Sequence, residues 1–199
     1  MTAIPVMPER QARAVARIAK VNHAGEYGAI RIYGAQILVS RLLWPKLVPL
    51  LTELHSHEIA HCRVFREAMP ERRARPCRIM PLWSAGGWVL GFVTALTGPK
   101  MIWACTEAVE ATVHRHLNDQ IAYLEDRDEP LRRSILAIRD EEEGHLSLAK
   151  SHIGVPNRLT ALLERVIERC VEGAIWMSTW GDSSRMRHDL SAFGEGGKP

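Results

Sequence analysis

Apolar residues recur along most of the chain at spacings of three and four positions, which is the period of an amphipathic helix. The sequence contains no alternating strand pattern and no Asn-Gly or Asp-Gly hairpin turn. The polar, glycine-rich residues 181–199 are predicted to form a disordered tail. The predicted fold class is therefore all-α. Six helices are predicted, several of them bounded by proline, over residues 9–42, 46–69, 80–97, 100–125, 130–153 and 157–180.

Composition limits the classes of protein that this helical pattern can represent. The chain has 199 residues, of which 46% are hydrophobic and 25% are charged, as is ordinary for a globular protein. That length suits one hydrophobic core, so residues 1–180 are predicted to form a single domain. A net charge of +3 is too small to indicate nucleic-acid binding. The four cysteines lack CxxC spacing and suit a reducing compartment, and we recognise no secretion signal near the N-terminus.

An internal repeat is the strongest signal in the sequence. The only two Glu-x-x-His motifs, at Glu58 and Glu142, lie 84 residues apart. The repeat predicts two related helical hairpins that face each other across a pseudo-two-fold axis. The same offset superimposes Glu26 on Glu110, Arg31 on Arg115, Gln36 on Gln120, Ile37 on Ile121, Glu58 on Glu142 and His61 on His145.

The repeated residues have the chemistry and spacing of a dinuclear metal site. Residues at i and i+3 share one face of a helix, so each Glu-x-x-His pair can converge on one point. Four carboxylates inside a bundle would be costly without a compensating charge, and two divalent metals would remove that cost. Di-iron and di-manganese carboxylate bundles use this donor set. The predicted ligands are Glu26, Glu58, His61, Glu110, Glu142 and His145, and oxygen and imidazole donors without thiolates favour iron or manganese.

A simpler interpretation exists for each motif taken alone. The run EEEGH is more often a solvated helix face than a ligand set, and the residues HSHEIAH could belong to an ordinary helix. The metal site becomes the preferred interpretation only because all these motifs belong to the same repeat. Tyr27 and Tyr33 are expected to be core aromatics that hydrogen-bond near the site. The remaining acidic and histidine residues near the motifs are expected to be structural or solvated: Glu107, Glu141, Glu143, His55, His57 and His114.

Residues 79–99 form an apolar segment without any charge, bracketed by Arg78 and Lys100. The segment is about as long as a membrane span. A true span would separate the two halves of the metal site, so we expect a helix lying at the membrane interface, with Trp83 and Trp88 toward lipid. The alternatives are a buried bundle helix or an oligomer interface.

Four stretches carry a family resemblance: NHAGEYGAIRIYGAQ, MPLWSAGGWVLGFVTALTG, ACTEAVEATVHRHLNDQI and IRDEEEGHLSLA. From about residue 12 to residue 180, the chain resembles the demethoxyubiquinone hydroxylase family of ubiquinone biosynthesis. The resemblance implies a ferritin-like four-helix bundle with an apolar membrane-interface helix and a C-terminal helix. It also implies a di-iron monooxygenase that uses O2 to hydroxylate the ring of a demethoxyubiquinol. The six residues above are then the ligands of two iron ions.

The resemblance further implies a position for the protein and a role for one more residue. The family is membrane-associated, so we expect this chain at the cytoplasmic face of a bacterial inner membrane. His116 matches a histidine thought to assist electron transfer, whereas Leu117 replaces the tyrosine often found beside it. We expect NADH or a reductase as the electron donor, and a second copy of the chain or other ubiquinone-biosynthesis proteins as further partners.

Two other function classes share parts of the pattern. A ferritin-like or rubrerythrin-like protein, which oxidises iron or removes peroxide, would use the same ligands but would not need the apolar segment. A non-catalytic membrane assembly subunit would keep the fold without needing all six buried ligands.

Overall fold

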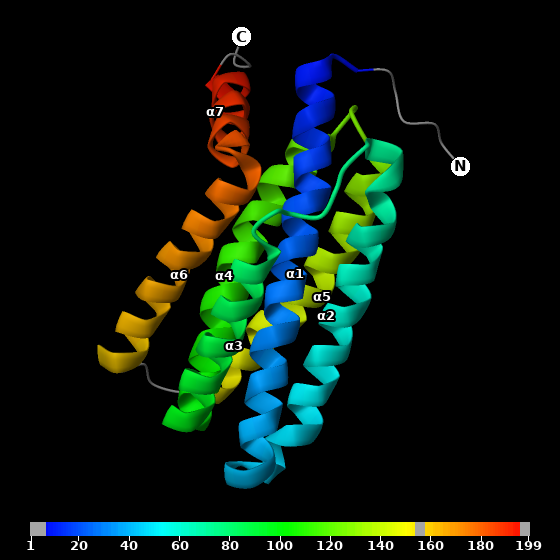
Figure 1. Ribbon diagram of the computed structural model, residues 1–199. Coiled ribbons are helices and arrows are strands. Elements are labelled where there is room, and N and C mark those ends of the chain that lie inside the picture. The colour runs from blue at the N-terminus through cyan, green and yellow to red at the C-terminus, as the bar shows by residue number, and fades with distance from the viewer. Residues whose placement is uncertain (1–6, 154–157, 196–199) are drawn as a thin grey trace.

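The computed structural model describes residues 7–153 and 158–195 of the chain (Figure 1). The described part is mostly helical and contains no strand, which confirms the predicted all-α class. Two short 3-10 helices, η1 (Pro45–Leu47) and η2 (Pro70–Arg72), precede and follow the second helix. The α-helices are α1 (Glu9–Leu43), α2 (Val48–Ala68), α3 (Met80–Thr97), α4 (Pro99–Leu124), α5 (Glu129–Ile153), α6 (Arg158–Thr179) and α7 (Asp182–Glu195).

The helix boundaries follow from local signals in the sequence. Proline stands within the first two positions of α2, α3 and α4, where its missing N–H costs nothing. At the start of α5, the Asp128 carboxylate accepts a hydrogen bond of 3.1 Å from the backbone N–H of Leu131. The six predicted helices agree with the observed bounds to within one or two residues.

Four long helices, α1, α2, α4 and α5, hold two hydrophobic clusters. One cluster packs the early part of α1 and the late part of α2 against residues such as Leu124 and Ile135. The other packs the late part of α1 and the early part of α2 against residues such as Ile102 and Ile153. The middle of each of the four helices therefore lies between two apolar layers, and the predicted ligands lie in that middle level.

Helix α3 lies against α1 with very close backbone contact. A Cβ atom at Gly91 would lie 2.4 Å from the carbonyl oxygen of Ile32, and one at Gly87 would lie 2.6 Å from that of Gly28. Only glycine allows this approach at these two positions. The contact leaves the opposite face of α3 exposed, with Leu82, Val89, Val93 and Leu96 each more than half exposed.

The expected orientation of the tryptophans on α3 was wrong. Trp83 and Trp88 are only partly exposed. The indole N–H of Trp83 donates to Ser178 Oγ on α6 at 3.1 Å, and Trp88 stacks on Phe92. Aliphatic side chains therefore form the exposed face of α3. Among the helices of residues 7–153 and 158–195, none has both the length and the apolar character needed to cross a membrane.

The prediction of a disordered tail over residues 181–199 was also wrong for most of that segment. Residues Asp182–Glu195 form α7, while residues 196–199 lie outside the described part. Arg17 donates a hydrogen bond to the Asp182 carboxylate, and Met186 packs into the hydrophobic cluster that also contains Leu124. The folded unit therefore extends beyond the predicted boundary at residue 180, because contacts with α1 and α4 order a locally polar segment.

Candidate metal centre

Six acidic and histidine side chains turn into the bundle at its middle level. The i, i+3 spacing places Glu58 and His61 on one face of α2, and Glu142 and His145 on one face of α5. The structure thus brings together every residue predicted as a ligand. Each is at most 5% exposed: Glu26 on α1, Glu58 and His61 on α2, Glu110 on α4, and Glu142 and His145 on α5.

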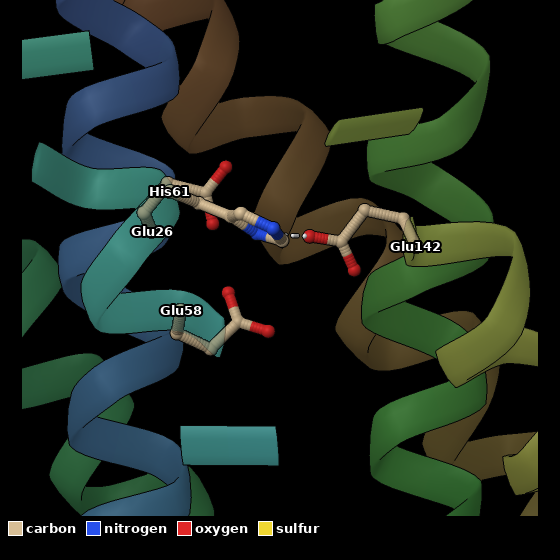
Figure 2. Close-up of side chains that lie close together, drawn as sticks. All are labelled: Glu26, Glu58, His61 and Glu142. Atoms are coloured by element: carbon tan, nitrogen blue, oxygen red, sulfur yellow. Dashed lines mark ion pairs between the residues drawn. The ribbon is translucent and has the colours of Figure 1, made fainter. Parts of the chain in front are cut away.

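These side chains form two overlapping groups, in each of which the donor atoms lie within 4.8 Å of one another. The first group is Glu26, Glu58, His61 and Glu142 (Figure 2). The second is Glu58, Glu110, Glu142 and His145. Each group has four buried donors, which is enough to hold one metal ion. Glu58 and Glu142 belong to both groups and would therefore lie between two metals.

The distances around Glu142 show how one carboxylate serves both groups. Oε1 of Glu142 lies 2.9 Å from Nδ1 of His61, whereas Oε2 lies 2.9 Å from Nδ1 of His145. Figure 2 shows the first of these contacts, which crosses from α2 to α5. Each oxygen of Glu142 therefore faces a different histidine, and each histidine directs Nδ1 into the site.

The carboxyl groups differ strongly in their affinity for protons. Burial, assisted by the charge of Glu142, raises the pKa of Glu26 to about 7. The same two causes raise the pKa of Glu58 and of Glu110 well above the usual range. Burial also acts on Glu142, but its contacts with His145 and His61 hold its pKa at about 2. Three buried carboxyls thus favour a bound proton, which a divalent cation could replace.

One unpartnered atom fits the same interpretation. Among the described residues, the buried Oε1 of Glu58 has no hydrogen-bond partner. Buried polar atoms are nearly always paired, so this carboxylate oxygen is placed to bind a cation. The donor set of oxygen and imidazole nitrogen suits iron or manganese.

An apolar cavity of about 550 Å³ leads to this site. Its walls come from α1, α3, α4 and α6, and its lining includes Glu26, Glu58, Glu110 and Glu142. Most of the remaining lining is aliphatic, including Leu90, Val109, Val113, Leu163, Ile167 and Val171. The cavity could therefore hold a large apolar molecule with one end beside the carboxylates.

Comparison with known proteins establishes the family. The model of the family described as "Ubiquinone biosynthesis protein COQ7" matches residues 13–178. The chain belongs to the COQ7 family. This match confirms the resemblance predicted from the sequence motifs, and it covers all six residues of the two metal-holding groups.

Relatives of this COQ7-family chain have names that describe hydroxylation of a demethoxyubiquinone or a demethoxyubiquinol. The Mus musculus protein named NADPH-dependent 3-demethoxyubiquinone 3-hydroxylase, mitochondrial, is 40% identical over 169 residues, covering 83% of this chain and 77% of its own. The Rhodospirillum rubrum protein named 3-demethoxyubiquinol 3-hydroxylase is 35% identical over 162 residues, covering 81% of this chain and 76% of its own. The Saccharomyces cerevisiae protein named 5-demethoxyubiquinone hydroxylase, mitochondrial, is 34% identical over 188 residues, covering 85% of this chain and 79% of its own.

His116, a site residue predicted from the sequence in addition to the six ligands, lines the same cavity in this COQ7-family chain. Its Nε2 lies 3.0 Å from Oε2 of Glu172 on α6, and the ring is 6% exposed. Burial lowers the pKa of His116 despite the Glu172 carboxylate, which favours the neutral form of the ring. The neighbouring Leu117 packs in the hydrophobic cluster and offers no polar group to the cavity.

Three residues outside the predicted ligand set contact it. The Tyr33 hydroxyl donates to Oε1 of Glu110 at 3.3 Å, which confirms the expected hydrogen bond near the site. Tyr27 is only partly buried, and its hydroxyl accepts a hydrogen bond from Arg31 rather than contacting a ligand. His57 and Glu141 were expected to be structural or solvated, but each contacts a ligand histidine at a distance below 3.2 Å. No signal for either residue existed in the sequence, because the 84-residue offset pairs His57 with Glu141, two different residue types.

Proposed function

We propose that this protein is a di-iron monooxygenase that uses O2 to hydroxylate the ring of a demethoxyubiquinol in ubiquinone biosynthesis. One observation carries the proposal. In a COQ7-family chain, two groups of buried donors share Glu58 and Glu142 beside an apolar cavity large enough for a quinol ring. The names of the relatives supply the substrate class, since they describe hydroxylation of demethoxyubiquinone or demethoxyubiquinol.

The donor chemistry supports two iron ions in the proposed site. Glu26 and His61 would hold one metal, and Glu110 and His145 would hold the other. Glu58 and Glu142 would contact both, because they belong to both groups. Neither group includes a cysteine among its described members, which disfavours a thiolate-bound metal. When bound, two ferrous ions supply the O2-activating redox chemistry that side chains lack.

In this proposal, the bundle is ferritin-like, and α1–α2 and α4–α5 are hairpins related by a pseudo-two-fold axis. The membership of the two groups supports this view. Exchanging Glu26 and His61 for Glu110 and His145, the residues 84 positions later, converts one group into the other. We also infer one domain, which includes α7 because Met186 packs into the cluster built by α1, α2, α4 and α5.

The residues of the cavity would bind the substrate and exclude water. The aliphatic walls suit a polyprenyl tail, and they bury it beside the carboxylates where the ring must react. His116 and the mutually hydrogen-bonded pair Asn22 and Gln120 also line the cavity. These polar groups would orient the ring oxygens. With Nε2 held by Glu172, His116 would accept or return a proton at the quinol, or assist electron transfer as the family resemblance suggests.

The exposed apolar residues support a peripheral membrane position. Leu82, Val89 and Val93 on α3, and Val166 and Met177 on α6, are each close to half exposed or more and also line the cavity. A lipid surface against these side chains would let a membrane-dissolved quinol enter directly. In this proposal, the protein binds at the cytoplasmic face of a bacterial inner membrane. Electrons come from a reduced nicotinamide nucleotide, directly or through a reductase, as the NADPH in several relatives' names suggests.

Quinone profiling by mass spectrometry tests the function directly. Cells that lack this gene should accumulate a demethoxy quinone precursor. Wild-type protein should clear the precursor, whereas Glu142→Ala should not, although that variant keeps its helical content. An unchanged quinone pool in the deletion strain would refute the hydroxylase and leave the ferritin-like or rubrerythrin-like alternative. An unchanged pool together with protein that purifies without iron would favour the non-catalytic assembly subunit.

A further inference from the structure

The two ligand histidines have different partners on their outer nitrogen. His61 directs Nδ1 into the site and presents Nε2 to Oε2 of Glu141, at 3.1 Å. His145 also directs Nδ1 into the site, but presents Nε2 to Nδ1 of His57, at 2.9 Å. The imidazole planes of His57 and His145 differ by only 8°, as expected for two rings joined edge to edge by a hydrogen bond.

These two outer partners occupy the same place in the repeat. His57 directly precedes Glu58, and Glu141 directly precedes Glu142, so the 84-residue offset relates the two positions. Each contacts the ligand histidine of the opposite hairpin. The backbone arrangement is therefore repeated while the side chain is not. One half supplies a carboxylate and the other half an imidazole.

This difference changes the donor strength of the ligand histidines. A metal-bound imidazole donates its remaining N–H outward, and an anionic acceptor increases the basicity of the ring more than a neutral one does. His61 can donate to the negatively charged carboxylate of Glu141. His145 can donate only to a ring nitrogen of His57, and an imidazole carries no negative charge.

A second difference acts in the same direction. The Tyr33 hydroxyl donates a hydrogen bond to Oε1 of Glu110, which withdraws electron density from that carboxylate. The 84-residue offset relates Tyr33 to Leu117, whose side chain cannot donate a hydrogen bond to Glu26. The group that contains Glu110 and His145 thus has the weaker carboxylate donor as well as the weaker imidazole donor.

We propose that the two metal positions are unequal, and that divalent metal binds first and more tightly beside Glu26 and His61 than beside Glu110 and His145. This inference rests on the proposed dinuclear site. Glu141 and His57 are positioning residues that act through the ligand histidines. Removing such an outer partner changes metal affinity by roughly 10- to 100-fold in known sites. Because Glu141 is 57% exposed, we expect about a tenfold effect, at the lower end of that range.

Titration of the metal-free full-length protein with Co²⁺ tests the inequality. Binding is followed under anaerobic conditions by calorimetry and by visible absorption, and neither readout depends on hydroxylase activity. Wild-type protein should show two steps that differ in affinity by about tenfold or more. Glu141→Gln should weaken the tighter step by about tenfold and leave the other step nearly unchanged.

Glu143→Gln is the matched control for that variant. Glu143 lies on the same helix, is 56% exposed and contacts His114 rather than a ligand histidine, at 3.0 Å. The Glu143→Gln variant should leave both Co²⁺-binding steps unchanged. The reciprocal variant, His57→Glu, should strengthen the weaker step by about tenfold and bring the two steps together. Tyr33→Phe should shift the weaker step in the same direction by a smaller amount.

Several results would overturn the inference. They are two equal steps in wild-type protein, equal effects of Glu141→Gln and Glu143→Gln, or an unchanged weaker step in His57→Glu. Circular dichroism confirms that each variant is folded. If Glu141→Gln does not fold, the His57→Glu result decides alone. A chain that binds no Co²⁺ contradicts the proposed dinuclear site, whereas a chain that binds two ions equally and still hydroxylates the quinol contradicts only the inequality.

Discussion

Oε1 of Glu58 lies 3.6 Å from Nδ1 of His145, although the two residues belong to different hairpins. Glu58 is thus placed beside the histidine of the opposite Glu-x-x-His motif as well as near its own. Glu142 has the converse relationship, since one of its oxygens lies 2.9 Å from Nδ1 of His61. The shared glutamates tie the two halves of the site into one unit, so loss of either should affect both metals.

The first prediction compares a shared glutamate with an unshared one. Glu142→Ala should reduce bound iron to nearly none, because each group of donors loses a member and the imidazoles lose their common anion. Glu110→Ala should retain about one iron per chain, because the group of Glu26, Glu58, His61 and Glu142 stays complete. Iron is measured by elemental analysis of purified protein, and circular dichroism checks that both variants fold. Equal iron content in the two variants would contradict the shared role of Glu142.

The second prediction concerns the pH dependence of the metal-free protein. The pKa of Glu26 is raised from 4.5 to about 7 by burial and the charge of Glu142. Burial lowers the pKa of His61, but the nearby carboxylates of Glu142 and Glu26 raise it overall, from 6.5 to about 9. Both groups hold protons more tightly in the folded state than in the unfolded state. Their stabilising contribution is therefore complete at low pH and is lost as pH rises, over 4.5–7 for Glu26 and 6.5–9 for His61.

Thermal unfolding across this pH range provides the measurement. The Tm of metal-free protein should fall as pH rises from 4.5 to 7, and Glu26→Gln should flatten the fall because its amide does not titrate. Added Co²⁺ should have the opposite trend and stabilise more at higher pH, because binding must displace protons. The prediction fails if wild type and Glu26→Gln give parallel curves.

The third prediction uses the close contact between α3 and α1. Gly91→Ala would place a Cβ atom 2.4 Å from the carbonyl oxygen of Ile32 and 2.7 Å from Cβ of Ala35, so α3 must move away. We expect a loss of roughly 1–3 kcal/mol in the free energy of unfolding. Gly86→Ala is the control, because no atom outside its own stretch of helix lies within 4 Å of its Cβ position, and alanine should stabilise the helix there by about 0.5–1 kcal/mol. Urea unfolding followed by circular dichroism measures both, and similar values would show that α3 is not fixed by this contact.

The fourth prediction concerns the exposed apolar rim of the cavity. Val89→Ser combined with Val93→Ser should reduce binding to anionic liposomes in a flotation assay, because two apolar side chains are lost from the proposed lipid-facing surface. Iron content should not change. Ile59→Ser is the control, since Ile59 is 49% exposed but lies on α2 and does not line the cavity. Equal flotation of wild-type protein, the double variant and Ile59→Ser would refute the membrane-facing role of α3.

The fifth prediction tests a buried ion pair that links η2 to the start of α5. Arg72 donates two hydrogen bonds of 2.7 Å to the Asp128 carboxylate, and the two side chains are 4% and 0% exposed. Asp128→Ala should cost about 3–5 kcal/mol in the free energy of unfolding, because the buried guanidinium loses its carboxylate and keeps the Ala68 carbonyl as its nearest acceptor. The substitution also removes the cap on the backbone N–H of Leu131. Arg133→Ala, which removes an exposed contact with Glu129, should have a much smaller effect on the denaturation midpoint. Comparable midpoints for the two variants would contradict this assignment.

Local patterns in the sequence were enough to predict the helices, because periodicity and proline positions act within a few residues. They failed at α7, whose residues are mostly polar. That helix is fixed by the contact between Arg17 and Asp182 and by the burial of Met186, and both partners come from distant parts of the chain. Local patterns also failed to predict the orientation of Trp83, which depends on its hydrogen bond to Ser178 of α6.

The sequence by itself determined which residues could form the site, because i, i+3 spacing on a helix and an internal repeat are properties of the chain alone. Tertiary structure decided how those residues are shared. The placement of Glu58 and Glu142 in both groups depends on where α2 and α5 meet, as do the contacts of His57 and Glu141 with histidines of the opposite hairpin. The cavity likewise exists only because α3 and α6 pack beside α1 and α4, and no local pattern specifies that packing.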